Sequence, residues 1–511
     1  MLPKSSNLET KVSLEREAVP VAEDPPFLIL IAGDFSGRAN LLASTDAALT
    51  TPKPIEIDRD NFDDVLRKLN VGLRIRAGDS GVLPLSFREL DDFHPDSIFR
   101  QIPLFEEFRE TRKRLLDPKT FESAAREVRD WVDGGESEAV PEPAVEQAED
   151  RSYQTGGLLE DILGSTKRDA AAYPAQTTDT SELSAFVREL VRPYLITTDE
   201  SEQAKLVSVV DSITGDLMRR VIHDPAFKEL EAAWRALYLV VRGAETGTDL
   251  KIFLYDISKQ ELESDLKRES LDDSDYYSAV ARRAEQSADG TPWALICGAF
   301  NFSADVEDTA TLIRLGKISG QVQAPFISHI RPEILGVKSL ESSPTPADWD
   351  LESETQASKL WTTLRTVPEA VNIGLAMPRF LVRLPYGEDT DPTEAFSFEE
   401  LTEDGRHEGY LWANPCFICA LLMARTFSAS GWEIGRRYFL DVEGLPTHIY
   451  TTDGVTETKP CAEVAMTHEA CDVLIEQGLM PVISFKDTDR VKLGGFQSVA
   501  FPAKDLNGRW T

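Results

Sequence analysis

The chain of 511 residues has room for roughly two to four domains, and a chain this long can bury large hydrophobic cores without disulfides. Its 54 Lys and Arg residues against 88 Asp and Glu residues give a net charge of -34, which disfavours nucleic-acid binding because that binding depends on neutralising phosphates. Five scattered cysteines argue against a disulfide framework, and neither a signal sequence nor an apolar membrane span is visible. These features predict a soluble cytoplasmic protein with no membrane insertion.

Residues 1–24 are polar and acidic, and we expect them to form a flexible arm. Within the arm, residues 10–15 alternate polar and apolar side chains, with Val12 and Leu14 on one side. Plain disorder and a short strand donated to a partner both remain open for this stretch.

A buried strand is predicted at Phe27–Ala32, a continuous apolar run that suits a strand covered on both faces. The Gly-rich sequence Gly33-Asp-Phe-Ser-Gly-Arg38 follows it. It contains neither the Gly-Lys-Ser/Thr of a phosphate loop nor the order of a nucleophile elbow, so we interpret it as a structural turn.

A short strand and a helix are predicted over residues 55–69, followed by a hairpin over residues 73–87. The next stretch, Leu90-Asp-Asp-Phe-His-Pro-Asp96, places several metal-ligand residue types close together. However, Pro95 directly after His94 is typical of a helix start, and Asp96 suits its first turn. Helix capping is therefore favoured over a metal site.

A helix is predicted at residues 121–132, and an acidic linker rich in Pro, Ala and Glu follows, so that residues 134–180 separate two folded parts. Inside this linker, residues 158–167 have the pattern of a short amphipathic helix. Its apolar side consists of Leu158, Leu159, Ile162 and Leu163. An isolated helix this short is marginal in water, so it either packs on the chain's own core or binds a partner.

The remainder of the chain alternates predicted helices and strands, which indicates a mixed α/β core. Helices are expected at residues 181–195 and 224–241, and strands at residues 250–256, 294–298 and 324–327. A last apolar helix should begin near Asn414-Pro415 and reach Trp432.

The residues give no sign of an active site, a metal site or a cofactor site, so we expect no enzymatic activity. Cys416 and Cys419 have a suggestive spacing, but they lie in an apolar helix where cysteine acts as a small hydrophobic residue. The six histidines show no metal-ligand spacing. Arg379 and Arg383 alternate with apolar residues, a pattern that would place both on one face of a strand. Three alternatives remain open for that face: it is solvated, it pairs with carboxylates, or it contacts a neighbouring subunit.

Two blocks of motifs resemble the contractile-sheath proteins of type VI secretion systems. Asp58-Arg-Asp-Asn-Phe-Asp63, Asp91-Asp-Phe-His-Pro-Asp96 and Arg100-Gln-Ile-Pro103 are similar to motifs of the small sheath subunit, TssB (VipA), over residues 25–118. The motifs of residues 224–235, 360–365, 374–387 and 410–432 resemble the large subunit, TssC (VipB), over residues 158–511.

The resemblance implies a sheath-type mixed α/β fold with sheets flanked by helices. A TssB-like domain (residues 25–133) and a TssC-like core domain (residues 181–511) would be fused in one chain. Family members form a helical tube around an inner tube, joined by exchanged strands, so the implied partners are sheath subunits, inner tube and baseplate. In the family, an N-terminal helix of the large subunit, comparable to residues 158–167, is captured by an AAA+ disassembly ATPase.

The chain departs from the family pattern at both ends. Its small-subunit part starts shortly before the first core strand. Its large-subunit part is expected to be shortened, because it stops with residues 496–511 where family members continue into a further segment that carries the exchanged strands. Two interpretations follow. The chain is a structural sheath component, or it is a non-polymerising accessory or regulatory protein that binds the sheath or baseplate.

Overall fold

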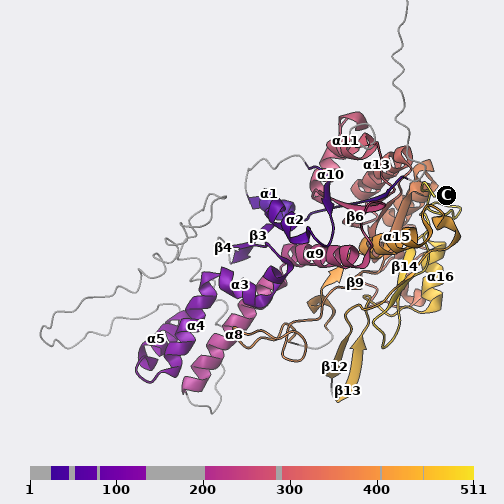
Figure 1. Ribbon diagram of the computed structural model, residues 1–511. Coiled ribbons are helices and arrows are strands. Elements are labelled where there is room, and N and C mark those ends of the chain that lie inside the picture. The colour runs from indigo at the N-terminus through magenta and orange to yellow at the C-terminus, as the bar shows by residue number, and fades with distance from the viewer. Residues whose placement is uncertain are drawn as a thin grey trace, which may run out of the picture.

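A computed structural model describes residues 25–44, 52–77, 81–133, 202–283, 290–402, 406–452 and 454–510 (Figure 1). Hereafter the N-terminal segment means residues 25–133 and the C-terminal segment means residues 202–510. The expected arm at residues 1–24, the linker at residues 134–180 and the helix at residues 181–195 lie outside the described residues.

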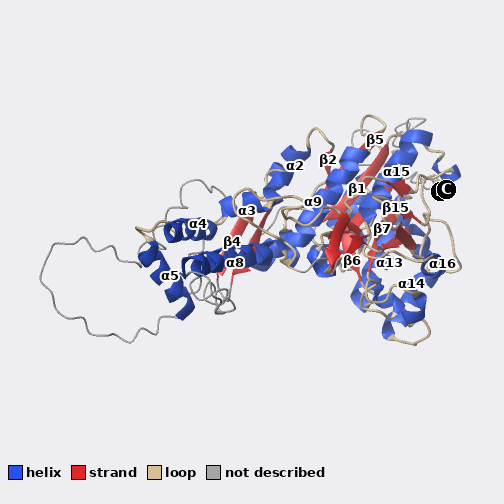
Figure 2. Ribbon diagram, turned by 90° about the horizontal axis from the view of Figure 1, so that it is seen from below, coloured by secondary structure: helices blue, strands red, loops and turns tan. Residues whose placement is uncertain are grey.

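One nine-stranded mixed sheet forms the centre of the molecule and confirms the mixed α/β fold class (Figure 2). Its inner strands run parallel, and antiparallel strands close both edges. In spatial order the strands are β11 (Asp441–Val442), β15 (Val491–Leu493), β14 (Met480–Ser484), β8 (Ile373–Met377), β7 (Phe326–Ile330), β6 (Leu295–Phe302), β1 (Phe27–Gly33), β5 (Leu250–Asp256) and β2 (Ile55–Ile57).

Helices cover both faces of this sheet, so its inner strands are apolar on both sides. One face packs against α9 (Pro225–Gly243) and α15 (Cys416–Ser430). The opposite face packs against α10 (Lys259–Leu266), α11 (Asp275–Ala281), α13 (Val306–Val322), α14 (Gln356–Thr366) and α16 (His468–Glu476).

The strand predicted at Phe27–Ala32 is confirmed as β1. Side chains at Phe27, Ile29 and Ile31 join the core on the α9 side, whereas Leu28 and Leu30 join the core on the other side. All seven residues of β1 are buried, because an inner strand of a covered parallel sheet leaves no side for solvent.

The rest of the N-terminal segment lies against α9 and α8. It comprises α1 (Arg38–Ser44), α2 (Phe62–Leu69), the hairpin of β3 (Gly72–Ala77) and β4 (Gly81–Ser86), and α3 (Pro95–Gln101). Beyond α3, the helices α4 (Pro103–Leu116) and α5 (Phe121–Asp133) pack with α8 (Glu202–Ile222) into a three-helix arm. The arm extends away from the sheet (Figures 1 and 2).

Two small hairpins complete the C-terminal segment: β9 (Phe380–Leu381) with β10 (Trp412–Ala413), and the projecting β12 (His448–Thr452) with β13 (Val455–Lys459) (Figure 1). The predicted division into separate domains at residues 25–133 and 181–511 stays a prediction. In the structure, strands of both segments belong to one sheet. Among the described residues, no helix combines the length and the apolar character needed to cross a lipid bilayer.

Candidate functional site: the interface between the two segments

The N-terminal segment contributes an inner strand to a sheet that otherwise belongs mainly to the C-terminal segment. Residues 27–33 of β1 pair in parallel with residues 250–256 of β5, and residues 29–32 pair with residues 295–298 of β6. Removing β1 would leave backbone N–H and C=O groups on the facing edges of β5 and β6 without hydrogen-bond partners in a core that excludes water. The two segments therefore need each other to complete one fold.

The turn after β1 is held by a carboxylate of the C-terminal segment. Asp256, at the end of β5, accepts hydrogen bonds from the backbone N–H of Phe35 (2.9 Å), the N–H of Ser36 (3.0 Å) and the Ser36 hydroxyl (2.7 Å). Arg38 forms ion pairs with Asp256 at 3.4 Å and with Glu261 of α10 at 2.7 Å. The predicted structural turn is confirmed, and its polar groups form hydrogen bonds and ion pairs with the C-terminal segment.

Inside this turn, Asp34 and Gly37 fix the backbone. Asp34 accepts hydrogen bonds from the N–H groups of Arg38 (2.6 Å) and Ala39 (2.8 Å), where α1 begins. Burial raises the pKa of Asp34 to about 6, although these hydrogen bonds oppose the shift. Gly37 has φ of +81°, and a Cβ there would lie 2.2 Å from the carbonyl oxygen of Gly72. The turn therefore requires glycine at this position.

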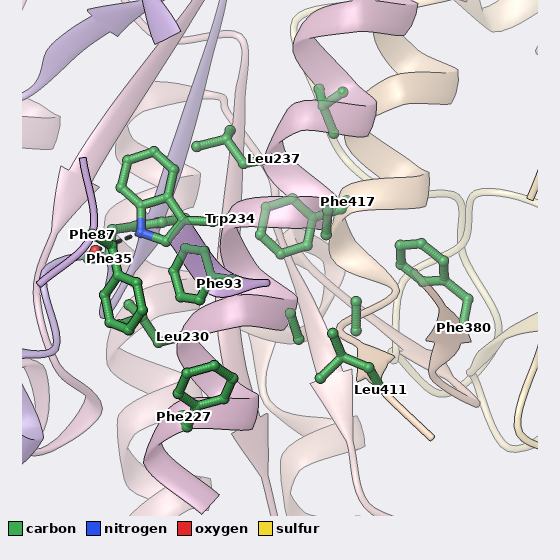
Figure 3. Packing of buried hydrophobic residues seen from close by; sticks show 14 of the residues in the cluster. Phe35, Phe87, Phe93, Phe227, Leu230, Trp234, Leu237, Phe380, Leu411 and Phe417 are labelled. Carbon is green, nitrogen blue, oxygen red and sulfur yellow. Dashed lines mark hydrogen bonds between the residues drawn. The ribbon is translucent and has the colours of Figure 1, made fainter. Parts of the chain in front are cut away.

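An aromatic cluster joins the segments beside the turn (Figure 3). The indole N–H of Trp234 on α9 donates a 2.7 Å hydrogen bond to the carbonyl oxygen of Phe35, and the two rings meet edge to face. Phe87 and Phe93 stack with ring centroids 4.1 Å apart, and both meet Phe227 of α9 edge to face. The helix predicted at residues 224–241 thus uses its apolar stripe to bind the N-terminal segment.

The motif at residues 91–96 begins α3 and also contacts the C-terminal segment. His94 Nδ1 accepts a 3.2 Å hydrogen bond from the N–H of Asp96, which confirms the predicted helix start. The Asp96 carboxylate accepts 2.9 Å hydrogen bonds from the N–H groups of Glu394 and Ala395, and the His94 ring meets the Tyr386 ring at 5.0 Å. The residue types that suggested a metal site therefore position a helix against residues 386–396.

A buried ion-pair network holds that receiving segment in place. The Arg383 guanidinium binds Glu231 of α9 at 2.8 Å and Glu400 at 2.7 Å, and Glu400 also accepts a 2.8 Å hydrogen bond from the N–H of Tyr386. Exposed fractions of the three charged side chains are 7%, 0% and 1%. The network thereby fastens residues 383–400, the docking surface for α3, onto α9.

Charge compensation keeps both buried carboxylates ionised. Burial alone would raise the pKa of Glu400, but the Arg383 charge and the hydrogen bonds from His223, Arg383 and the N–H of Tyr386 lower it to about 2. Burial likewise opposes ionisation of Glu231, and Arg383 and Arg235 lower its pKa. Such a network is costly to break because each remaining charge would be buried without a partner.

The second predicted contact arginine also has a partner within the chain. Arg379 binds Glu463 through two guanidinium nitrogens, at 2.6 and 3.0 Å, and its side chain is 36% exposed. The regular strand here covers Phe380–Leu381 alone, so Arg379 and Arg383 flank it rather than share one strand face. Carboxylate pairing, one of the expected alternatives, is confirmed for both. A subunit contact at these arginines stays a prediction. Arg379 is the more accessible of the two, because the Arg383 side chain is only 7% exposed.

The other predicted positions divide into confirmed core residues and residues that are not described. Cys416 and Cys419 are fully buried in α15, and burial raises the pKa of the Cys419 thiol to about 12. Within the described ranges, no group of three or more His, Cys, Asp or Glu side chains is placed to hold a metal ion. The following predicted residues lie outside the described part of the chain: Val12, Leu14, Leu158, Leu159, Ile162 and Leu163.

Sequence reasoning missed Asp256, Glu231 and Glu400, which carry the interface. Glu231 and Arg383 are 152 residues apart, so no local spacing could pair them. Asp256 did stand at the end of one predicted strand, and the turn follows the end of another. That position was the available signal, because the carboxyl ends of neighbouring parallel strands lie together.

The sheet, turn, aromatic cluster and ion-pair network define a class of protein: a structural module assembled from two interdependent segments. Comparison with known families gives the identity of both segments. Residues 204–500 match the family described as "EvpB/VC_A0108, tail sheath N-terminal domain". Residues 10–133 match the family described as "Type VI secretion system, VipA, VC_A0107 or Hcp2". The chain belongs to the sheath protein family of type VI secretion systems.

Individual relatives agree with this assignment. The chain is 32% identical over 358 residues to the type VI secretion system sheath protein TssC1 of Pseudomonas aeruginosa, covering 68% of this chain and 70% of that protein. It is 26% identical over 129 residues to the sheath protein TssB1 of the same organism, covering 24% of this chain and 71% of that protein. The resemblance to both sheath subunits in one chain is therefore confirmed.

Proposed function

We propose that the chain is a single-chain structural subunit of a type VI secretion sheath, in which one polypeptide supplies a TssB-like and a TssC-like part in fixed one-to-one ratio. The observation that carries this proposal is the position of β1 between β5 and β6. A shared inner strand makes the pair of segments one rigid building block, as a force-transmitting lattice requires. The work of such a subunit is assembly rather than catalysis.

The partners in this proposal are other sheath subunits, either copies of this chain or separate TssB-like and TssC-like proteins, in the cytoplasm. An inner tube, a baseplate and an AAA+ disassembly ATPase complete the assembly. The family match to residues 10–133 includes the stretch for which disorder and a donated strand both remained open. In this proposal, the donated strand carries Val12 and Leu14, and the ATPase binds the apolar side formed by Leu158, Leu159, Ile162 and Leu163 when that side is not packed on the chain itself.

The test is negative-stain electron microscopy of the full chain, expressed alone and together with TssB-like and TssC-like subunits. We expect tubes with this chain along the wall. Replacing Val12 and Leu14 with proline should abolish tubes, because proline cannot donate a hydrogen bond to a neighbouring strand. The matched control Ser13→Ala should still form tubes.

Two outcomes would overturn the proposal. A compact particle that joins preformed sheaths only at an end or on their outside would identify a non-polymerising accessory protein. Tubes that form equally well with the double proline variant would remove the donated strand from the lattice. The variant's thermal unfolding should match that of the native chain, so that a lost lattice is distinguished from a lost fold.

A further inference from the structure

A groove runs along α8, on the side of the three-helix arm that faces residues 388–399. Two adjoining cavities of about 550 and 660 Å³ make up this groove. Leu116 at the end of α4 and Asp211 of α8 line both of them. In the larger cavity, α4 forms one side and residues 388–399 of the C-terminal segment form the other.

The groove has an apolar lining that solvent reaches at Leu116 and Phe396. Phe99, Phe108 and Phe398 lie buried beneath the larger cavity, whereas Phe396 is half-buried and Leu116 between the two cavities is 51% exposed. Covering a large exposed aliphatic side chain with an apolar partner lowers the free energy, because apolar surface is removed from water. The lining therefore suits the apolar side of a helix.

Charged residues of opposite sign lie on the two sides of the groove. A ligand with acidic residues beside its apolar stripe and basic residues at its end would complement both sides. The side formed by α4 carries Arg109, which pairs with Glu106, Arg112, which pairs with Asp211 of α8, and Lys113. Residues 388–399 on the other side carry Glu388, Glu394 and Glu399.

The chain itself leaves and re-enters at this groove. The helix α5 ends at Asp133 and α8 begins at Glu202, and these helices are joined by an ion pair between Arg129 and Glu202. Gln203, which lines the smaller cavity, donates a 2.7 Å hydrogen bond to a carbonyl oxygen of α4. Twenty-four residues lie between Asp133 and residue 158, enough to span at most about 85 Å.

We propose that residues 158–167 of the same chain dock into this groove, with Leu158, Leu159, Ile162 and Leu163 on its apolar lining. Glu160 and Asp161 would face the basic residues of α4, and Lys167 would face the carboxylates of residues 388–399. Tethering at both ends gives this segment a local concentration that a free partner rarely reaches. This inference goes beyond the proposed function, because it holds whether or not the chain polymerises.

The test measures the accessibility of Leu116→Cys in the full chain. Maleimide labelling will report this position selectively, because all five native cysteines are buried. Replacing the four apolar residues of the segment with serine should raise the labelling rate about tenfold or more, since the tethered ligand is lost. The matched control, Ser165→Ala with Thr166→Ala in the same segment, should leave the rate unchanged.

A second measurement locates the contact. A fluorescent peptide of residues 156–168 should bind the serine variant and not the native chain, where the groove is filled. Ser208→Arg, an exposed change on the lining of the smaller cavity, should abolish peptide binding. Equal labelling rates in the native chain and the serine variant would overturn the proposal. So would protection that rises with protein concentration, which would identify a second copy as the occupant.

Discussion

Replacing Arg383 with methionine tests whether the buried network holds the interface. Methionine keeps much of the side-chain volume and removes the charge, so Glu231 and Glu400 would remain buried without their shared partner. Breaking a buried ion pair by removing one member typically costs about 3–5 kcal/mol. We expect a loss in this range, because both carboxylates are at most 1% exposed.

Urea unfolding in the full chain measures this loss. With an m-value of about 3 kcal/mol/M, the midpoint should fall by about 1 M or more. The matched control is Arg67→Met, which removes an exposed pair with Asp64 and should cost no more than about 0.5 kcal/mol. Adding Glu400→Gln to the Arg383→Met variant should recover part of the loss, because Glu400 is then neutral while Glu231 keeps its 2.7 Å ion pair with Arg235.

The pH dependence of stability should also change its slope. In the native chain Glu400 has a pKa of about 2, below its unfolded value, so its contribution is present above about pH 5 and lost as the pH falls toward 2. In the Arg383→Met variant, burial would raise the carboxylate pKa, so stability would increase as the pH is lowered from about 7 to 5. Parallel pH profiles, or a loss no larger than that of Arg67→Met, would refute this account of the network.

Three further predictions concern the rest of the interface. Gly37→Ala should destabilise the chain by more than about 1 kcal/mol because of its positive φ and the nearby Gly72 carbonyl, whereas Gly247→Ala, with open space around it, should change stability by less than about 0.5 kcal/mol in the same urea assay. Asp96→Ala should cost about 1–2 kcal/mol and speed hydrogen exchange at the N–H groups of Glu394 and Ala395, and unchanged exchange there would contradict the contact. A protease site inserted between residues 140 and 150 should, after cleavage, yield two fragments that co-elute in gel filtration, and separation without denaturant would refute the shared inner strand.

Local patterns predicted much of the fold because they depend on neighbouring residues. The apolar run at residues 27–32 and the helical stripe at residues 224–241 appear as β1 and α9 with nearly the expected bounds. The strand expected at residues 294–298 extends to Phe302, because paired neighbours continue to bury its alternate side chains. The order of strands in the sheet was not predictable in this way, since it depends on pairings between residues more than 200 positions apart.

The candidate site was less predictable because its residues looked ordinary one at a time. The motif at residues 91–96 was correctly interpreted as a helix start, but its sequence does not say that Asp96 also binds two backbone N–H groups about 300 residues away. Arg383 was expected on a strand face, whereas it lies just after a two-residue strand and faces inward. A buried charge is recognised only when the carboxylates around it are known, and these come from distant parts of the chain.

The position of β1 also explains what the connection between the segments contributes. An inner strand with partners on both sides forms all of its contacts whether its chain continues into the next segment or not, so the native interface does not depend on the connection. Joining the segments instead makes their association unimolecular, and the entropic cost of a connection grows slowly with its length. A long acidic connection between residues 133 and 202 is therefore compatible with the structure, because its length has little effect on the interface between the two segments that it joins.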